Sequence, residues 1–127
     1  MLLSLDEHDN RPLYLQIVNQ IKEQVSNGTL QPGNELPSVR EVADSLGINM
    51  HTVRSAYLKL RDQDIITLRL GRRAKVARRQ STTYTTDMEA DLKARVRELI
   101  TDALLIGLSA DDFLDLVSRQ LEQQKDK

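Results

Sequence analysis

The sequence predicts a mostly α-helical protein that contains one small β-hairpin. Apolar residues recur at helical spacing along five segments, and one stretch between the third and the fourth segment is rich in β-forming residues. A length of 127 residues with 39% hydrophobic side chains suffices for about one compact domain with a short appendage. We therefore expect three helices, a hairpin and two further helices in chain order.

The first predicted helix spans residues 12–27. Pro12 suits a first helical turn, and Gly28 can adopt the left-handed conformation that ends a helix. A Pro-Gly turn lies in the linker of residues 29–37. The apolar positions that form one stripe along this helix are Leu13, Ile17, Ile21 and Val25, with Tyr14 and Val18 beside them.

Two further helices follow with a tight turn between them. Ser38 and Glu41 have the spacing of a capping box, Gly47 ends the second helix, and Asn49 can cap the third. This spacing is typical of a helix-turn-helix. The two apolar stripes are Val39, Val42, Ala43 and Leu46 on the second helix, and Val53, Ala56, Tyr57 and Leu60 on the third.

The hairpin is predicted at residues 66–70 and 74–77, on either side of Gly71, Arg72 and Arg73. Three helices followed by a two-stranded ribbon make the winged form of the helix-turn-helix. The predicted fold class is therefore mostly α with a small β-hairpin: a winged helix-turn-helix followed by a two-helix tail.

The tail begins after residues 78–86, which have no hydrophobic period and read as a linker. Thr86 to Glu89 form a second capping box, Gly107 ends the helix that it opens, and Ser109 to Asp112 cap the last helix. The apolar surface of these helices is wider than one partner helix covers, so we expect a homodimer. The candidate dimerisation residues are Leu92, Val96, Leu99, Ile100, Ala103, Leu104, Leu105, Ile106, Phe113, Leu114, Val117 and Leu121.

The net charge of −1 conceals a polarised distribution. Residues 1–80 hold 12 basic and 9 acidic side chains, whereas residues 81–127 hold 6 basic and 10 acidic ones. Within residues 67–79 there is no acidic residue, and such a cationic edge suits phosphate groups. Its basic residues are Arg69, Arg72, Arg73, Lys75, Arg78 and Arg79.

The composition argues against metal chemistry and catalysis. The chain has no cysteine and two histidines, His8 and His51, neither of which has a partner set for a metal site or for general-base catalysis. We expect no cofactor and no enzymatic activity. The apolar run in the first ten residues is too short for the core of a signal peptide. No stretch approaches the roughly 20 apolar residues of a membrane span. We therefore expect a cytosolic protein without a membrane partner.

The predicted third helix carries the clearest candidate binding surface. Opposite its apolar stripe a helical wheel places His51, Arg54, Ser55 and Leu58. The His, Arg and Ser side chains can donate to base edges in the major groove of DNA, although the same pattern fits a solvated helix face. The cationic hairpin favours nucleic acid. Arg40 can bind a phosphate or pair with Glu41 or Asp44, and His51 can contact DNA or be a partly exposed structural residue.

Residues 36–77, LPSVREVADSLGINMHTVRSAYLKLRDQDIITLRLGRRAKVA, closely resemble the winged helix-turn-helix of the GntR family of bacterial transcription regulators. That pattern has Leu-Pro-Ser-x-Arg-x-Leu-Ala near one helix, Val-x-Arg near the next, and a glycine-rich wing. Residues 12–35 are similar to the family's first helix and turn. Residues 96–124 resemble the two-helix dimerisation tail of the small YtrA-type subfamily, and the chain is too short for the large ligand-binding domains of other members.

The resemblance implies that residues 1–79 bind DNA and that residues 80–127 form a linker and a dimerisation tail. By position, Arg40 and Arg54 correspond to the family's DNA-contacting arginines, and Gly71 lies in the wing. Three residues depart from the pattern: Met50 stands where many members have Arg, Asp64 replaces a Gly, and Arg73 replaces the second wing glycine. The complete set of candidate DNA-binding residues is Arg40, Asn49, His51, Thr52, Arg54, Ser55, Arg69, Gly71, Arg72, Arg73 and Lys75.

We therefore predict a sequence-specific DNA-binding transcription regulator that acts as a homodimeric repressor on a palindromic operator. The resemblance suggests an operon that contains ABC-transporter genes, and it names no small-molecule effector. The alternative is a winged-helix module that binds proteins or senses a small ligand without binding DNA. That alternative requires no cationic edge, and this chain has one.

Overall fold

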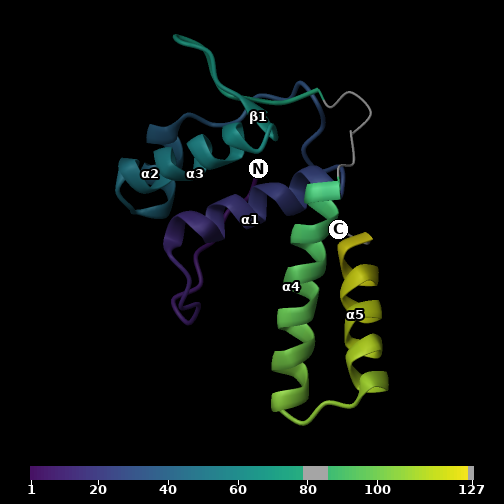
Figure 1. Ribbon diagram of the computed structural model, residues 1–127. Helices are drawn as coiled ribbons and strands as arrows, with labels where there is room; N and C mark the ends of the chain where they lie inside the picture. Colours follow the sequence, from purple (N-terminus) through teal and green to yellow (C-terminus); the bar gives the residue numbers. More distant parts are fainter. Residues whose placement is uncertain (79–85, 126–127) are drawn as a thin grey trace. The chain divides into compact units, whose positions relative to one another are not determined.

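The computed structural model describes residues 1–78 and 86–125 (Figure 1). The chain divides into two compact units, Met1–Arg79 and Gln80–Lys127. The described residues form five helices and one two-stranded antiparallel sheet, which confirms the predicted fold class. In chain order the elements are α1 (Leu13–Ser26), α2 (Val39–Leu46), α3 (Met50–Asp62), β1 (Ile66–Thr67), β2 (Lys75–Val76), α4 (Thr86–Leu105) and α5 (Ala110–Lys125).

The ends of the first three helices follow local chemistry. Pro12 is the N-cap of α1 and not its first helical residue, so its missing N–H costs the helix nothing. The Ser38 hydroxyl accepts a hydrogen bond from the Glu41 N–H at 3.1 Å at the start of α2. Asn49 Oδ1 accepts from the His51 N–H at 2.8 Å at the start of α3. The three predicted helices are thus present with ends shifted by about one residue.

The turns after α2 and α3 both use a left-handed residue. Gly47 has φ 67°. Asp64 has φ 59° and is the one non-glycine residue with positive φ in the described part of the chain. Asp64 stands where the family pattern has Gly, and an aspartate adopts this conformation at a higher cost than glycine does. The turn is held nonetheless, because the Ile65 N–H donates to the Leu60 carbonyl at 2.9 Å and the Ile65 side chain is buried.

The core of the first unit is built around α3, which packs against α1, α2 and β1. The predicted α3 stripe of Val53, Ala56, Tyr57 and Leu60 is at most 2% exposed. From the other elements, the fully buried side chains are Ile17, Val18, Ile21, Leu36 and Ile66. Burial of a large aliphatic side chain to this extent contributes about 1.5–3 kcal/mol. The position of α3 therefore depends on packing against three other elements.

The hairpin is shorter than predicted. Its ladder comprises the pairs Ile66 with Val76 and Thr67 with Lys75, not the five- and four-residue strands expected from composition. The chain leaves the ladder because its backbone groups find other partners. The Ala74 carbonyl accepts from the Leu36 N–H at 2.8 Å, and the Arg69 carbonyl accepts from the Arg72 N–H at 3.1 Å. We call residues 66–76 the wing.

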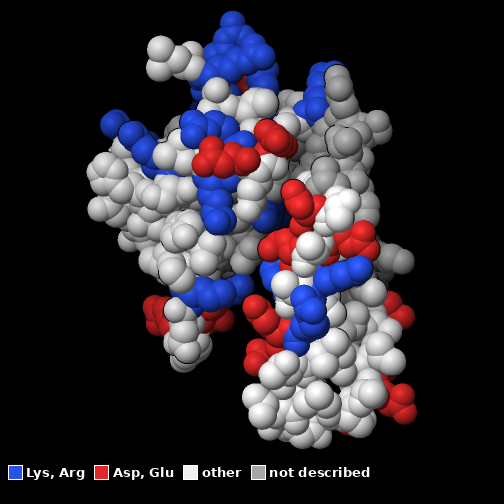
Figure 2. Space-filling model, in the orientation of Figure 1, with Lys and Arg blue, Asp and Glu red and all other residues white. Residues whose placement is uncertain are grey.

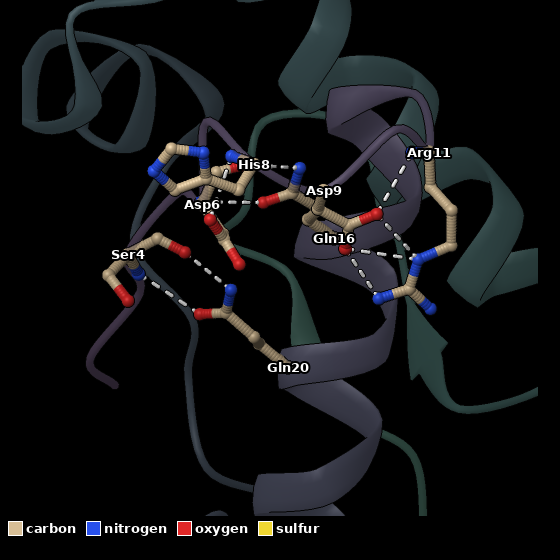
Figure 3. Close-up of polar contacts among 7 residues, drawn as sticks. All are labelled: Ser4, Asp6, His8, Asp9, Arg11, Gln16 and Gln20. Carbon is tan, nitrogen blue, oxygen red and sulfur yellow. Dashed lines mark hydrogen bonds and ion pairs between the residues drawn. The ribbon is translucent and has the colours of Figure 1, made fainter.

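The N-terminal residues 1–6 form an extended strap along α1, which no pattern in the sequence predicted. Three glutamines spaced about one turn apart on α1 hold its backbone. Gln16 binds both the N–H and the carbonyl of Asp6, and Gln20 does the same for Ser4 (Figure 3). Gln24 binds the Leu2 carbonyl at 2.7 Å.

The alternate residues of the strap face the core. Met1, Leu3 and Leu5 are half-buried against it, whereas Leu2 is 88% exposed. Met1 and Leu3 line a small cavity together with residues of α2, among them Val42 and Leu46. The strap therefore contacts both α1 and α2, which each pack on α3.

The second unit is a helical hairpin of α4 and α5, and the two helices contact each other. Gly107 has φ 94°, and the Leu108 N–H donates to the Ala103 carbonyl at 3.0 Å, which ends α4 as predicted. Ser109 and Asp112 form the predicted cap: the Asp112 N–H donates to Ser109 Oγ and the Ser109 N–H to Asp112 Oδ2, both at 3.1 Å. Hydrogen bonding from Ser109, chiefly from its backbone N–H, lowers the pKa of the Asp112 carboxyl. The predicted linker, residues 78–86, lies almost wholly outside the described residues.

We expect Gln16→Ala to lower the free energy of unfolding by about 1–3 kcal/mol. The Gln16 side chain is buried, and its removal leaves both the N–H and the carbonyl of Asp6 without their hydrogen-bond partner. Gln24→Ala should cost less, since it removes one hydrogen bond. Urea titration followed by circular dichroism measures both. Gln31→Ala, at an exposed position, is the control. Equal losses at Gln16 and Gln31 would contradict a strap held by glutamines.

Candidate nucleic-acid interface

The exposed face of α3 carries the polar residues that the sequence predicted for it. His51, Arg54 and Ser55 are exposed, and Thr52 is half-buried. The Asn49 side chain uses its oxygen as the helix cap, and its NH₂ group donates to no residue within 1–78 and 86–125, so it can donate to another acceptor. The face is thus a row of hydrogen-bond donors at the N-terminal half of a helix whose opposite side is buried.

Tyr57 links α3 to the segment that precedes α2. Its hydroxyl donates a hydrogen bond of 2.6 Å to the Pro37 carbonyl, twenty residues earlier in the chain. Burial, with a contribution from the Glu41 carboxylate, raises the pKa of Tyr57 far above its ordinary value. The phenol therefore stays protonated and keeps its donor at all physiological pH values, so α3 is held in one orientation relative to α2.

Met50, one of the departures from the family pattern, is the first residue of α3. Its side chain is half-buried and packs against the core. The residue in this position therefore contributes packing at the helix start, where an arginine would offer a charge.

Glu41 forms an ion pair with the wing. Its two carboxylate oxygens accept from the Arg73 guanidinium at 2.6 and 3.0 Å. This hydrogen-bonded pairing lowers the pKa of Glu41 and raises the pKa of Arg73. A lowered carboxylate pKa means that the pair is complete above the ordinary pKa of glutamate and is lost only when the pH falls through the lower value of the folded state.

This ion pair bears on the roles predicted for Arg73 and Arg40. Arg73 was expected to bind phosphate, but in this structure its charge faces Glu41. Because Glu41 pairs with Arg73, it does not pair with Arg40. The sequence had left open whether Arg40 pairs with Glu41 or with Asp44. Arg40 is exposed in the first turn of α2 and forms no ion pair within residues 1–78 and 86–125.

The remaining basic residues line a groove that is formed by the wing, by Ala77 and Arg78, and by Gly33. The groove has a volume of about 410 Å³, and no acidic residue lines it. Figure 2 shows a concentration of basic side chains at the top of the view. The basic residues that line the groove are Arg69, Arg72, Arg73, Lys75 and Arg78; within the described part of the chain only Arg73 of these has a carboxylate partner.

Arg78 was part of the predicted cationic edge but not of the predicted site. Its guanidinium lies beside Gly33, where a Cβ on the glycine would be 3.5 Å from Arg78 Nη2. Gly33 has φ 87°, and its N–H donates to the Val76 carbonyl at 2.9 Å. The segment before α2 therefore completes the groove. The spacing of residues within the wing could not predict the contact of Arg78 with Gly33. Arg79 lies outside the described residues.

A second candidate surface lies on α4, α5 and the turn between them. Leu105 is 80% exposed and Ile106 is 77% exposed, values that are unusual for large apolar side chains. Ala103, which the sequence placed in the dimerisation set, is instead buried within the chain at 6% exposure, and Phe113 is half-buried. The other exposed apolar residues of these helices are Met88, Leu92, Val96, Leu99, Ile100, Leu104, Leu114, Leu116, Val117 and Leu121.

Two observations bear on metal sites and membranes. Nowhere in residues 1–78 and 86–125 do three histidine or acidic side chains gather closely enough to hold a metal ion. None of the described helices combines the length and the apolar character that crossing a membrane demands.

Comparison with known proteins gives one family and several relatives. The family described as "Bacterial regulatory proteins, gntR family" matches residues 13–76. The HTH-type transcriptional repressor YtrA of Bacillus subtilis (strain 168) is 33% identical over 110 residues, which are 87% of this chain and 85% of that protein. The match therefore extends through the winged unit into the helical tail.

Solved structures agree with this assignment. A transcriptional antiterminator from Listeria monocytogenes EGD-e has a TM-score of 0.91 and 28% identity, and covers 98% of this chain and 93% of its own. The DNA-binding domain of AraR in complex with operator ORE1 has a TM-score of 0.52 and 25% identity, and covers 61% of this chain and 94% of its own. The latter was solved with DNA bound.

Proposed function

Because the chain belongs to the GntR family of bacterial regulatory proteins and is a DNA-binding transcription regulator of the YtrA type, we propose that it is a homodimeric repressor that binds a palindromic operator. Its family and relatives are transcription regulators and not enzymes. The observation that carries the proposal is the donor face of α3 together with the unpaired basic residues of the wing. The function as a repressor follows the name of the Bacillus relative.

The proposed dimer rests on the apolar surface of α4 and α5. The first unit buries its own core, whereas the second unit leaves most of its large apolar side chains more than a third exposed. A second copy of the same hairpin supplies a matching apolar surface, and four helices bury what two cannot. A two-fold axis between the hairpins would relate two recognition helices, and a palindromic operator mirrors that symmetry.

In the proposed interface, α3 contacts the bases and the other basic residues contact the phosphates. Arg54 shares its helix face with His51 and Ser55 and is therefore assigned to base edges, where an arginine binds guanine O6 and N7 together. Arg40, Arg69, Arg72, Lys75 and Arg78 are assigned to phosphates.

A DNA partner implies a location in the cytosol. An operon with ABC-transporter genes remains the target that the YtrA resemblance suggests. Selection of bound duplexes from a random pool, compared with the region upstream of the protein's own gene, tests both the operator and the target. Selection of structured RNA in place of duplex DNA would overturn the proposal.

The first prediction concerns assembly. Full-length protein should be a dimer at micromolar concentration by light scattering, and Ile106→Glu should shift it toward monomer because a buried charge without a partner opposes association. Leu2→Glu is the matched control, since Leu2 is similarly exposed but lies in the first unit. A dimer that survives deletion of residues 80–127 would refute an interface on the tail.

The second prediction concerns salt dependence. Arg72→Ala should lower the slope of log affinity against log salt by about one unit on any duplex, because one phosphate contact is lost. Arg73→Ala should change the slope much less, since Glu41 already neutralises that side chain. Titrations at four salt concentrations measure both slopes. Equal effects would show that DNA displaces Glu41 from Arg73.

The third prediction concerns specificity. Arg54→Ala should cost about 1–3 kcal/mol on the operator and little on scrambled duplex, where phosphate contacts supply nearly all the affinity. Arg40→Ala should weaken both duplexes. Gel-shift titration of each variant at fixed salt makes the comparison. A similar loss for Arg54→Ala on both duplexes would reassign it to phosphate and leave His51 and Asn49 to read the bases.

A further inference from the structure

The turn of the wing, residues 69–73, is tied to the helices by one ion pair. All residues of this turn are exposed. Its own backbone hydrogen bond, from the Arg72 N–H to the Arg69 carbonyl, closes the turn on itself and reaches no other element. Within residues 1–78 and 86–125, the only hydrogen bonds that join this turn to a helix are those of Arg73 with Glu41.

A hollow separates the turn from α2 and α3. It has a volume of about 360 Å³, and its walls come from the start of α2, from Tyr57 of α3 and from the wing. Packing against the core ends with Leu68, which is half-buried, on one side of the turn and with Ala74, which is 5% exposed, on the other. The backbone bonds to the segment before α2 also end at Ala74, whose carbonyl accepts from the Leu36 N–H. The position of the turn is therefore set neither by the core nor by the ladder.

The geometry of the ion pair suits it to fix this position. Arg73 Nη1 donates to Glu41 Oε2 at 3.0 Å, and Nη2 donates to Oε1 at 2.6 Å. Two parallel bonds of this kind fix the orientation of the guanidinium as well as its distance from the carboxylate. After burial, the charge of Glu41 is the next cause that raises the pKa of Tyr57, and the charge of Arg73 opposes it. The pair thus lies where α2, α3 and the wing meet.

The strength of the pair limits what it can do. Both side chains are about half exposed, and an exposed ion pair changes an equilibrium by at most about fivefold. That is too little to hold the fold together, which the buried core does. It is enough to change how often an otherwise unattached turn is in place. Arg73 stands where the GntR pattern has a glycine, so the contact depends on a residue that departs from that pattern.

We propose that the Glu41–Arg73 pair sets the position of the wing relative to α3 before DNA binds, which makes Glu41 a positioning residue for DNA binding. This rests on the proposed function, in which α3 and the wing bind one duplex together. Such a duplex binds tightly only to molecules in which both elements are in place, so its affinity falls with the fraction of molecules in which the wing is displaced. Glu41 thereby favours the binding of a polyanion that its own charge repels.

Glu41→Ala separates this role from simple electrostatics, because the two predict opposite signs. If only charge matters, removal of an acidic residue near phosphates strengthens binding. If the pair positions the wing, Glu41→Ala should bind the selected operator about threefold to fivefold more weakly. Gel-shift titrations at four salt concentrations measure the affinity and the salt slope. Tighter binding with a slope steeper by about one unit would show that Glu41 only restrains a phosphate-binding Arg73, and would overturn the inference.

The double variant Glu41→Ala with Arg73→Ala keeps the net charge of the unaltered protein. It should show the same loss as Glu41→Ala and the salt slope of the unaltered protein, because the second substitution removes a side chain whose partner is already gone. Binding as tight as that of the unaltered protein would mean that the two charges merely cancel, and the inference would be wrong.

Asp62→Ala is the matched control. Asp62 is an exposed acidic residue that pairs with Arg61 at 3.0 Å in the same unit, but both residues lie on α3 and the pair joins no second element. Asp62→Ala should not weaken binding to the operator. A loss equal to that of Glu41→Ala would count against a role that depends on joining α2 to the wing.

The position of the turn is also measured without DNA. The amide heteronuclear NOE values of Gly71 and Arg72, which report motion on the picosecond to nanosecond timescale, should fall in Glu41→Ala and in the double variant and stay unchanged in Asp62→Ala. Urea unfolding should be nearly the same for all of them, which excludes a general loss of stability. Unchanged NOE values in Glu41→Ala would overturn the inference and leave the proposed function intact, provided that Arg54→Ala still loses the operator. Failure of the unaltered protein to bind any duplex would overturn both.

Discussion

The complete burial of one side of α3 is the constraint on which the rest of the first unit depends. Val53, Ala56, Tyr57 and Leu60 fill the space between α1, α2 and β1, and this packing fixes the rotation of α3 about its own axis. The opposite face is then free to carry polar residues, since none of them is needed for the core. Tyr57 strengthens the constraint, because its hydrogen bond to Pro37 also fixes how far α3 slides along α2.

The glutamines that hold the strap must match two different backbone repeats, that of α1 and that of the extended strap. Four residues of α1 advance about 6 Å along the helix axis, whereas two residues of extended chain advance about 6.7 Å. Gln16 and Gln20 each satisfy both backbone groups of their partner residue, but by the third rung the two repeats are out of step by more than 1 Å. The buried Oε1 of Gln24 accordingly accepts no hydrogen bond from any described residue, although its Nε2 still reaches Leu2.

The parts of the fold that the sequence predicted are those decided by neighbours in the chain. Ser38, Asn49 and the Ser109–Asp112 box are caps between residues two or three positions apart, and each forms. The strap, the Glu41–Arg73 pair and the contact of Arg78 with Gly33 join residues that are 10 or more positions apart, and no local spacing encodes them. The same reason accounts in part for the hairpin being predicted too long, since the Ala74 carbonyl accepts from the Leu36 N–H in the segment before α2.

The two units differ in what their stability depends on. The first buries its apolar side chains within the chain and so gains its hydrophobic free energy at any protein concentration. The second leaves Leu105, Ile106 and Leu114 largely in water, so on the proposed assembly its hydrophobic gain comes only with a second copy. Operator affinity would then depend on protein concentration through the tail, even though the residues proposed to contact bases lie in a unit that buries its own core. A regulator built this way adjusts occupancy through dimerisation without any change in the geometry of α3.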